Sequence, residues 1–228
     1  MSHLAQKKAS PNLRNSTNTE DIVIKDKVFY LFNKRLFDII GSIVGIIVLF
    51  PLFIVTTISI KLEDPKGPVF FSQKRIGKDG RVFNMYKFRS MVTDAEERLL
   101  ELLVKNETTG PMFKMKEDPR ITKVGRLIRK TSIDELPQLI NVLKGEMTLV
   151  GPRPPLPREV EKYTEYDKQR LLVVPGCTGL WQVSGRSNIG FDEMVKLDIA
   201  YIQKRSFFMD LSIIIKTIFM LFGSKNAY

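Results

Sequence analysis

Cysteine and histidine are almost missing from this chain of 228 residues, which contains one of each. Cys177 alone cannot form a disulfide within the chain, so nothing in the sequence requires an oxidising compartment. His3 lies in a polar N-terminal segment, and one histidine with one cysteine cannot build a cysteine-histidine zinc site. The same shortage excludes Ser-His and Cys-His catalysis. Chemistry in this chain therefore has to use carboxylates, lysines or a metal held by oxygen ligands.

Acidic residues are also scarce relative to basic ones. The chain has 36 Lys and Arg against 25 Asp and Glu, a formal net charge of +11, while 43% hydrophobic residues are typical of a globular protein. A protein of this charge favours anionic partners, namely nucleic acid, anionic lipid head groups or phosphorylated small molecules. Composition does not choose among these three.

Charge is absent from residues 39–60, an apolar segment that follows a polar N-terminal tail. The tail, residues 1–33, is expected to be flexible, and no secretory signal is expected in it. A run of about twenty apolar residues is long enough to cross the roughly 30 Å core of a bilayer as a helix. We therefore expect a membrane helix over residues 34–61.

Pro51 lies in the middle of this segment, where a proline removes a hydrogen bond and kinks or breaks a helix. Lysine and arginine flank the segment on both sides, whereas a spanning helix concentrates positive charge on the cytoplasmic side. Both features fit a re-entrant helix, which bends at Pro51 and leaves through the leaflet that it entered. A single-pass helix with a proline kink fits them as well. The residues leave both arrangements open.

The remaining chain, residues 62–228, is expected to be a small, mostly helical α+β domain. Two short strands joined by an Asp-Gly turn predict a β-hairpin at 69–89. Periodicity and boundary signals predict helices at 94–105, 123–130, 136–144 and 158–172, a rigid loop at 150–155 and a glycine-rich loop at 173–190. The apolar stretch 207–222 fits either a core helix or an amphipathic helix in the membrane interface.

Asp134 and Glu135 form an acidic pair between a basic segment and an apolar one. Such a pair suits phosphoryl chemistry, because one carboxylate can attack phosphorus and both can hold Mg²⁺ together with substrate phosphates. A simpler alternative is that Ser132 and Glu135 form a capping box at a helix start. Pro137 weakens this alternative, because it would then lie inside the helix, where its missing amide hydrogen costs a hydrogen bond.

Two arginines and a glycine-rich segment could bind the rest of a phosphorylated substrate. Arg129 precedes the acidic pair and Arg153 lies in a loop stiffened by prolines, so both could clamp phosphate oxygens. Residues 176–186 combine glycines with Trp181 and Arg186, which suits backbone contacts to an anion and stacking on a base or sugar. Taken singly, each of these residues is also typical of a surface charge or a core tryptophan.

Six motifs, in order along the chain, make this sequence similar to a known family. They are Lys34–Asp38, Gly67–Gly77, Tyr86–Met91, Ser132–Leu139, Asn141–Pro154 and Pro175–Arg186. They resemble those of the bacterial sugar transferases, the monotopic phosphoglycosyl transferases that begin capsule, exopolysaccharide and glycoprotein glycan assembly. The resemblance runs from Lys34 to about Phe222.

The resemblance implies a two-step reaction at the cytoplasmic face of the bacterial inner membrane. Family members bind a UDP-sugar and Mg²⁺, and the aspartate at the position of Asp134 attacks the sugar-bearing phosphate and releases UMP. Undecaprenyl phosphate then accepts the sugar phosphate. The expected site consists of catalytic Asp134 and Glu135, which also hold the metal, and substrate-binding Lys87, Arg89, Arg129, Arg153, Trp181, Gln182 and Arg186.

The family favours a re-entrant helix, with one departure in this chain. Members often have Ser-Pro at the bend, whereas here it is Phe50-Pro51, so no serine hydroxyl is present to bond the freed backbone. Membrane lipid is therefore an expected partner. Polar-faced helices also allow a homodimer.

Two rival hypotheses account for part of the sequence. A membrane-anchored nucleic-acid-binding or adaptor protein explains the charge and the apolar segment, but it gives no reason for the acidic pair, and no helix-turn-helix or stacking pattern is present. We therefore expect no nucleic acid partner. A transferase that joins both substrates directly, without a covalent intermediate, is the closer rival. The sequence does not identify the sugar.

Overall fold

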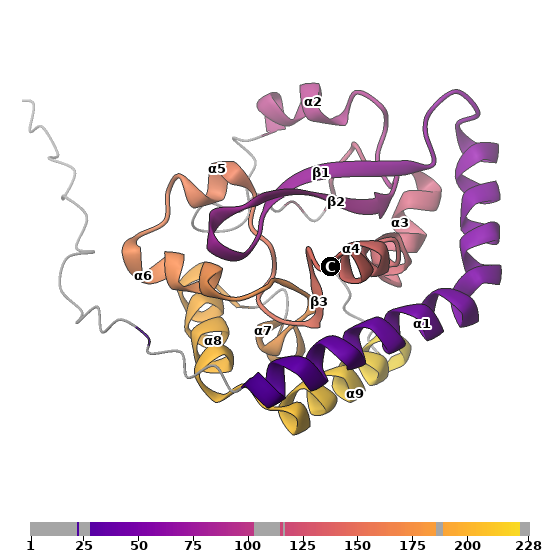
Figure 1. Ribbon diagram of the computed structural model, residues 1–228. Helices are drawn as coiled ribbons and strands as arrows, with labels where there is room; N and C mark the ends of the chain where they lie inside the picture. Colours follow the sequence, from indigo (N-terminus) through magenta and orange to yellow (C-terminus); the bar gives the residue numbers. More distant parts are fainter. Residues whose placement is uncertain (1–21, 23–27, 103–114, 116, 186–188, 224–228) are drawn as a thin grey trace, which may run out of the picture.

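The structure is a computed structural model that describes residues 22, 28–102, 115, 117–185 and 189–223. Residues 221–223 are described by their backbone alone. Most of the expected tail therefore lies outside the described residues. Helices and two small sheets follow one another along the chain, so the expected mixed α+β fold is confirmed. One long helix runs along the edge of the other elements (Figure 1).

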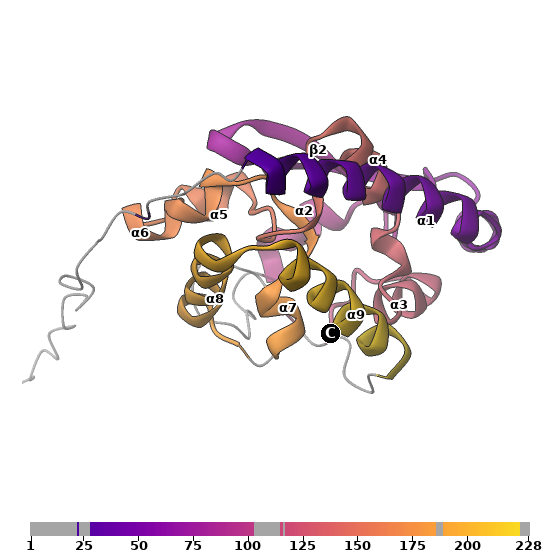
Figure 2. The same ribbon diagram turned by 60° about the horizontal axis from the view of Figure 1, so that its bottom comes forward.

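Helix α1, Val28–Glu63, is the one helix among the described residues that is long and apolar enough to cross a membrane. It begins before the expected boundary at residue 34, so the end of the expected tail is helical rather than flexible. Its ribbon changes direction: the first part runs beside α9, Phe207–Gly223, and the last part turns away from it (Figures 1 and 2). Pro51 lies inside the helix, and a proline is the usual cause of such a bend.

The side chains of α1 are distributed in the opposite way from those of a helix in a water-soluble protein. Asp38, Ser42 and Thr56 are buried against the rest of the molecule, and Ile60 is the single buried apolar residue of this helix. Large apolar side chains point outward instead, among them Ile47, which is 67% exposed. Extended apolar surface of this kind marks a membrane or partner interface. The helix therefore indicates a membrane-associated protein.

A β-hairpin follows α1, as the sequence predicts. Strand β1, Phe70–Ile76, pairs antiparallel with β2, Val82–Phe88, over its whole length. Asp79 and Gly80 at the turn both have positive φ, 55° and 77°, which explains the choice of an Asp-Gly pair.

The next two helices also begin near their expected positions. Helix α2 covers Ala95–Leu102, and the expected continuation to residue 105 lies outside the described residues. Helix α3, Lys123–Lys130, has the expected bounds. The Thr122 side chain accepts a hydrogen bond from the Gly125 amide at 2.9 Å and so caps the helix start.

The segment expected as one helix over 158–172 is divided into three short pieces. These are α5, Pro157–Val160, α6, Glu165–Lys168, and the 3-10 helix η4, Gln169–Leu172. The division arises because Thr164 and Asp167 cap α6 reciprocally, each side chain bonding the other's amide. A new helix therefore starts inside the expected one.

The expected glycine-rich loop at 173–190 contains regular structure. Strand β4, Gly176–Thr178, pairs in parallel with β3, Thr148–Val150, and α7 covers Leu180–Ser184. This expectation was wrong because a parallel strand of three residues is stabilised by a partner distant in the sequence, which local patterns do not show.

The C-terminal part consists of two helices, of which the sequence predicts the second. Helix α8, Phe191–Lys204, buries Val195, Ile199 and Tyr201 in the core. Helix α9 follows directly and packs beside α1, where the rings of Phe37 and Phe207 meet edge to face at 5.6 Å.

Candidate active site

The acidic pair lies in a short turn between two helices. A 3-10 helix, η3, covers Ile133–Glu135, and α4 begins only at Gln138 and ends at Lys144. Ser132, just before η3, has a left-handed backbone with φ of 56° and makes no side-chain cap. The capping-box alternative is therefore wrong. A non-glycine residue in this conformation is strained, and such strain concentrates at functional sites.

Asp134 is buried, with an exposed fraction of 6%. Burial raises the pKa of its carboxyl to about 6, while Lys87 opposes the rise and Glu135 adds to it. Arg129, at the exposed end of α3, also favours the carboxylate. At neutral pH the group is therefore a desolvated carboxylate surrounded by cations, which is a suitable environment for a nucleophile.

Glu135 has the opposite electrostatic behaviour. Its carboxylate Oε1 lies 2.6 Å from Lys87 Nζ. Burial acts to raise the pKa of Glu135, but the ion pair with Lys87 and the charges of Arg153 and Arg75 outweigh it and lower the pKa. Two adjacent carboxyls with pKa values shifted in opposite directions are suited to two different roles.

A small polar cavity of about 20 Å³ opens beside Glu135. It is lined by Arg75, Met85, Lys87, Glu135, Gln138, Arg153, Pro154, Gly176, Cys177 and Gln182. The lining residues come from several elements, among them both strands of the hairpin, the turn before α4, the loop after β3 and strand β4. The cavity collects three cationic side chains, which suits phosphate oxygens.

Arg75 is a functional candidate that our sequence analysis did not single out. It is 4% exposed, and its Nη1 donates to the Pro154 carbonyl at 2.9 Å. Its Nε is buried with no hydrogen-bond partner among the described residues, as is Gln182 Oε1 across the same cavity. Burial, helped by Arg153, lowers the pKa of Arg75 to about 9. Its position in the motif Gly67–Gly77 was the available signal.

The other expected site residues have different surroundings. Arg89 forms an ion pair with Asp64 at 2.7 Å, after the end of α1, and does not line the cavity. Trp181 packs against the apolar cluster around Phe191. Arg186 lies outside the described residues. The structure thus brings Lys87, Glu135, Arg153 and Gln182 together around the cavity. Asp134 and Arg129 are not among the lining residues, but both Lys87 and Arg129 act on the buried Asp134 carboxylate.

A second, larger cavity of about 590 Å³ is apolar and lies away from these groups, between the start of α1 and the start of α9. Phe29, Leu36, Ile40 and Phe207 are among its lining residues. None of its lining residues is acidic, so it offers no carboxylate that could attack phosphorus. The smaller polar cavity is therefore the candidate active site.

The donor set also bears on the expected Mg²⁺. The described residues contain no cluster of three or more His, Cys, Asp and Glu side chains that could hold a metal ion alone. Asp134 and Glu135 offer two carboxylates adjacent in sequence, of which that of Glu135 lines the cationic cavity. Mg²⁺ typically takes one or two protein carboxylates and completes its shell with substrate phosphates and water, so these residues fit that ion.

A buried carboxylate among cations, in a turn beside a membrane-associated helix, is typical of an enzyme that transfers phosphorylated groups. Comparison with known proteins identifies the family within this class of enzymes. The family model described as bacterial sugar transferase matches residues 29–224. The chain belongs to this family.

Named relatives agree with the family assignment. The galactosyl transferase CpsE of Streptococcus agalactiae is 53% identical over 84% of this chain and 42% of its own length. The undecaprenyl-phosphate galactose phosphotransferase of Salmonella typhimurium is 45% identical over 86% of this chain and 42% of its own length. The exopolysaccharide production protein ExoY of Rhizobium meliloti is 40% identical over 86% of this chain and 88% of its own length. The chain thus spans less than half of the first two relatives.

Proposed function

We propose that the protein transfers a sugar-1-phosphate from a UDP-sugar to undecaprenyl phosphate and releases UMP, as an early membrane step of exopolysaccharide, capsule or glycan synthesis. The observation that carries this proposal is the buried carboxylate of Asp134, which Lys87 and Arg129 act on and which directly precedes Glu135 in the lining of the cationic cavity. Relatives named as undecaprenyl-phosphate galactose and glucose phosphotransferases support the acceptor.

The proposed reaction has two displacements at one phosphorus. An Asp134 oxygen forms a bond to the sugar-bearing phosphorus, the bond to the bridging oxygen breaks, and UMP leaves with that electron pair. A phosphate oxygen of undecaprenyl phosphate then attacks the same phosphorus and restores the Asp134 carboxylate. Neither step needs a proton donor, since both leaving groups are stable anions. This agrees with a site that lacks histidine.

The remaining residues bind and orient in this proposal. The charge on the diphosphate of the UDP-sugar is offset by Lys87, Arg153 and Arg75. Gln182 Oε1 can accept a hydrogen bond from a hydroxyl or amide of the UDP-sugar. Mg²⁺, when bound by Asp134 and Glu135, would neutralise phosphate charge. Glu135 holds Lys87 at 2.6 Å and so keeps that cation beside Asp134.

UMP release from a panel of UDP-sugars tests the proposal and identifies the sugar. Asp134→Asn is expected to abolish release, because an amide cannot form the acyl phosphate. Asp94→Asn removes an exposed surface carboxylate and should leave the rate near that of the wild type. Near-normal turnover of Asp134→Asn would end the covalent mechanism, and a direct transfer through a ternary complex would replace it.

We further propose that α1 is re-entrant, so that the catalytic part sits on the cytoplasmic face of the inner membrane. The support is the bend of α1 and its exposed apolar side chains. Ser10→Cys and Lys225→Cys, each in a Cys177→Ala background, should both react with an impermeant thiol reagent only from the cytoplasm. Periplasmic labelling at position 10 would establish a spanning helix.

A further inference from the structure

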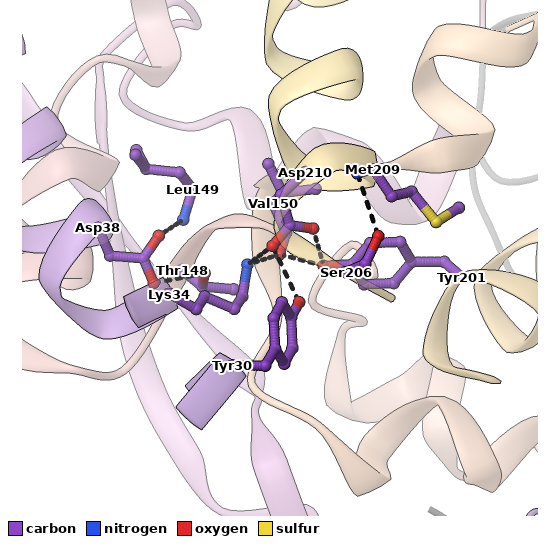
Figure 3. Close-up of polar contacts among 10 residues, drawn as sticks. All are labelled: Tyr30, Lys34, Asp38, Thr148, Leu149, Val150, Tyr201, Ser206, Met209 and Asp210. Carbon is purple, nitrogen blue, oxygen red and sulfur yellow. Dashed lines mark hydrogen bonds and ion pairs between the residues drawn. The ribbon is translucent and has the colours of Figure 1, made fainter. Parts of the chain in front are cut away.

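The carbonyl of Val150, at the end of β3, receives hydrogen bonds from side chains on two different helices. Lys34 Nζ of α1 and Tyr201 Oη of α8 both donate to it at 2.9 Å. Lys34 Nζ also donates to Asp210 of α9 at 2.9 Å, and Tyr201 Oη lies 2.7 Å from the same carboxylate, so the single hydroxyl hydrogen of Tyr201 is shared between the carbonyl and the carboxylate. Figure 3 shows these side chains converging on one another from their separate elements. One carbonyl and one carboxylate therefore tie three helices to the end of a strand.

This cluster is well shielded from water. Val150, Tyr201 and Asp210 are buried, and the Lys34 side chain is 13% exposed. Hydrogen bonds that involve charged groups are stronger than neutral ones, and a low local dielectric strengthens them further. The cluster therefore fixes the Val150 carbonyl firmly in place.

The loop after Val150 is restrained at nearly every residue. Gly151 donates its amide to the Thr178 carbonyl at 2.8 Å, and the Pro152 carbonyl accepts from the Gly176 amide at 2.8 Å. The Pro154 carbonyl accepts from Arg75. Prolines also fix φ at 152, 154 and 155. The loop is therefore a stiff connection between Val150 and Arg153, with few backbone torsions free to change.

The charged side chain that this loop presents to the polar cavity is Arg153. It lines the cavity together with Lys87 and helps to lower the pKa of Glu135. Arg153 Nη1 also lies 3.9 Å from Glu159, an ion pair at the limit of direct contact. A change of about 1 Å in the loop would therefore alter how Arg153 meets a phosphate, since bidentate contacts depend on geometry.

We propose that Lys34, Tyr201 and Asp210 are positioning residues that hold Arg153 in place for the diphosphate of the UDP-sugar. The positions of α1 and α9 relative to β3 then control the affinity of the protein for the UDP-sugar. The inference rests on the proposed function, which gives Arg153 a phosphate to bind. Both helices expose large apolar side chains, such as Ile47 of α1 and Phe208 of α9. The arrangement of the protein in the membrane is thereby linked to its nucleotide site.

Two tyrosines provide a matched pair of variants. The hydroxyls of Tyr30 and Tyr201 lie 2.9 and 2.7 Å from Asp210, but only the Tyr201 hydroxyl shares its hydrogen with the Val150 carbonyl. The experiment measures UDP binding with Mg²⁺ by calorimetry, using the full chain in lipid nanodiscs. Tyr201→Phe is expected to weaken UDP binding roughly three- to tenfold, and Tyr30→Phe about twofold or less.

A double-mutant cycle shows whether the effect passes through Arg153. In an Arg153→Ala background, Tyr201→Phe should weaken UDP binding no further, because the side chain that it positions is gone. A full effect of Tyr201→Phe in that background would overturn the inference. So would equal losses for Tyr30→Phe and Tyr201→Phe in the otherwise wild-type protein.

The outcomes separate this inference from the proposed function. Failure of the wild-type protein to bind UDP would overturn both, whereas normal wild-type binding with unaffected Tyr201→Phe binding would overturn the inference alone. Should Tyr201→Phe prevent folding, Lys34→Gln takes its place and is compared with Lys34→Arg, which keeps a charged donor. Rescue of UDP affinity by arginine is then expected, and its absence would count against the inference.

Discussion

Asp134 and Glu135 are neighbours in sequence, yet the structure gives their carboxyl groups different environments. Asp134 is buried and its pKa is raised, while Glu135 is paired with Lys87 and its pKa is lowered. A carboxylate that lacks a strong ion pair is the better nucleophile, and one that holds a lysine is the better organiser of charge. The pair can therefore divide the work of a phosphoryl transfer.

The raised pKa of Asp134 predicts a pH-dependent gain in stability for Asp134→Asn in the presence of a chelator. The folded protein favours the protonated acid, so the wild type loses stability as pH rises from about 4 to about 6, whereas the amide does not titrate. Above this window the variant should be more stable, by on the order of 2 to 3 kcal/mol. Denaturant unfolding at several pH values measures the difference. A difference that does not change with pH would contradict the account.

Local elements were well predicted from the sequence because their signals lie within a few residues of one another. The hairpin lies where two short strands around Asp79-Gly80 predict it, and α3 has the bounds expected from residues 123–130. Parts that depend on distant contacts were not predicted. Strand β4 exists through its pairing with β3, and Arg89 turns out to bind Asp64 rather than to line the cavity.

The site shows the same division between local and distant information. The acidic pair and Arg153 were identifiable from the sequence, because they belong to two motifs that follow one another along the chain, Ser132–Leu139 and Asn141–Pro154. Arg75 was not singled out, because its hydrogen bond goes to the Pro154 carbonyl in the loop after β3, 79 positions away in the sequence. Burial of a charged side chain cannot be inferred from local periodicity alone.

Glycine substitution tests the contact between β3 and β4. A Cβ at Gly176 would meet the Gly151 amide nitrogen at 2.0 Å, so Gly176→Ala should separate the strands and destabilise the fold by more than about 3 kcal/mol. Gly190→Ala serves as a control, because a Cβ there meets no atom of the described residues within 4 Å. Thermal unfolding of both variants measures the effect. Equal melting temperatures would show that the strands do not approach in this way.

At the scale of the whole molecule, the buried polar and exposed apolar residues of α1 reverse the usual pattern. The polar residues Lys34 and Asp38 reach inward to bond Val150, Thr148 and other groups of the catalytic part. Apolar residues cover the opposite side. In the proposed function, the helix thus joins the membrane to the nucleotide site within one small protein.

A single charge on the outer side of α1 should weaken membrane association. Ile47→Lys places an ammonium at a position 67% exposed and surrounded by apolar neighbours, at a cost of about 2 to 3 kcal/mol if that position lies in lipid. Leu100→Lys is the matched control, since Leu100 is 74% exposed on α2, outside the apolar helix. Fractionation and vesicle flotation compare the two. Equal membrane fractions would show that this side of α1 does not face lipid.

The most direct test of the central claim is detection of the phosphosugar on Asp134 itself. The protein is incubated with Mg²⁺ and a UDP-sugar labelled on the sugar-bearing phosphate, without acceptor lipid, and the modified peptide is sequenced by mass spectrometry. The account predicts one labelled site, at Asp134, and loss of that label when undecaprenyl phosphate is added. Release of UMP on adding the acceptor, with no labelled aspartate at any stage, would contradict it.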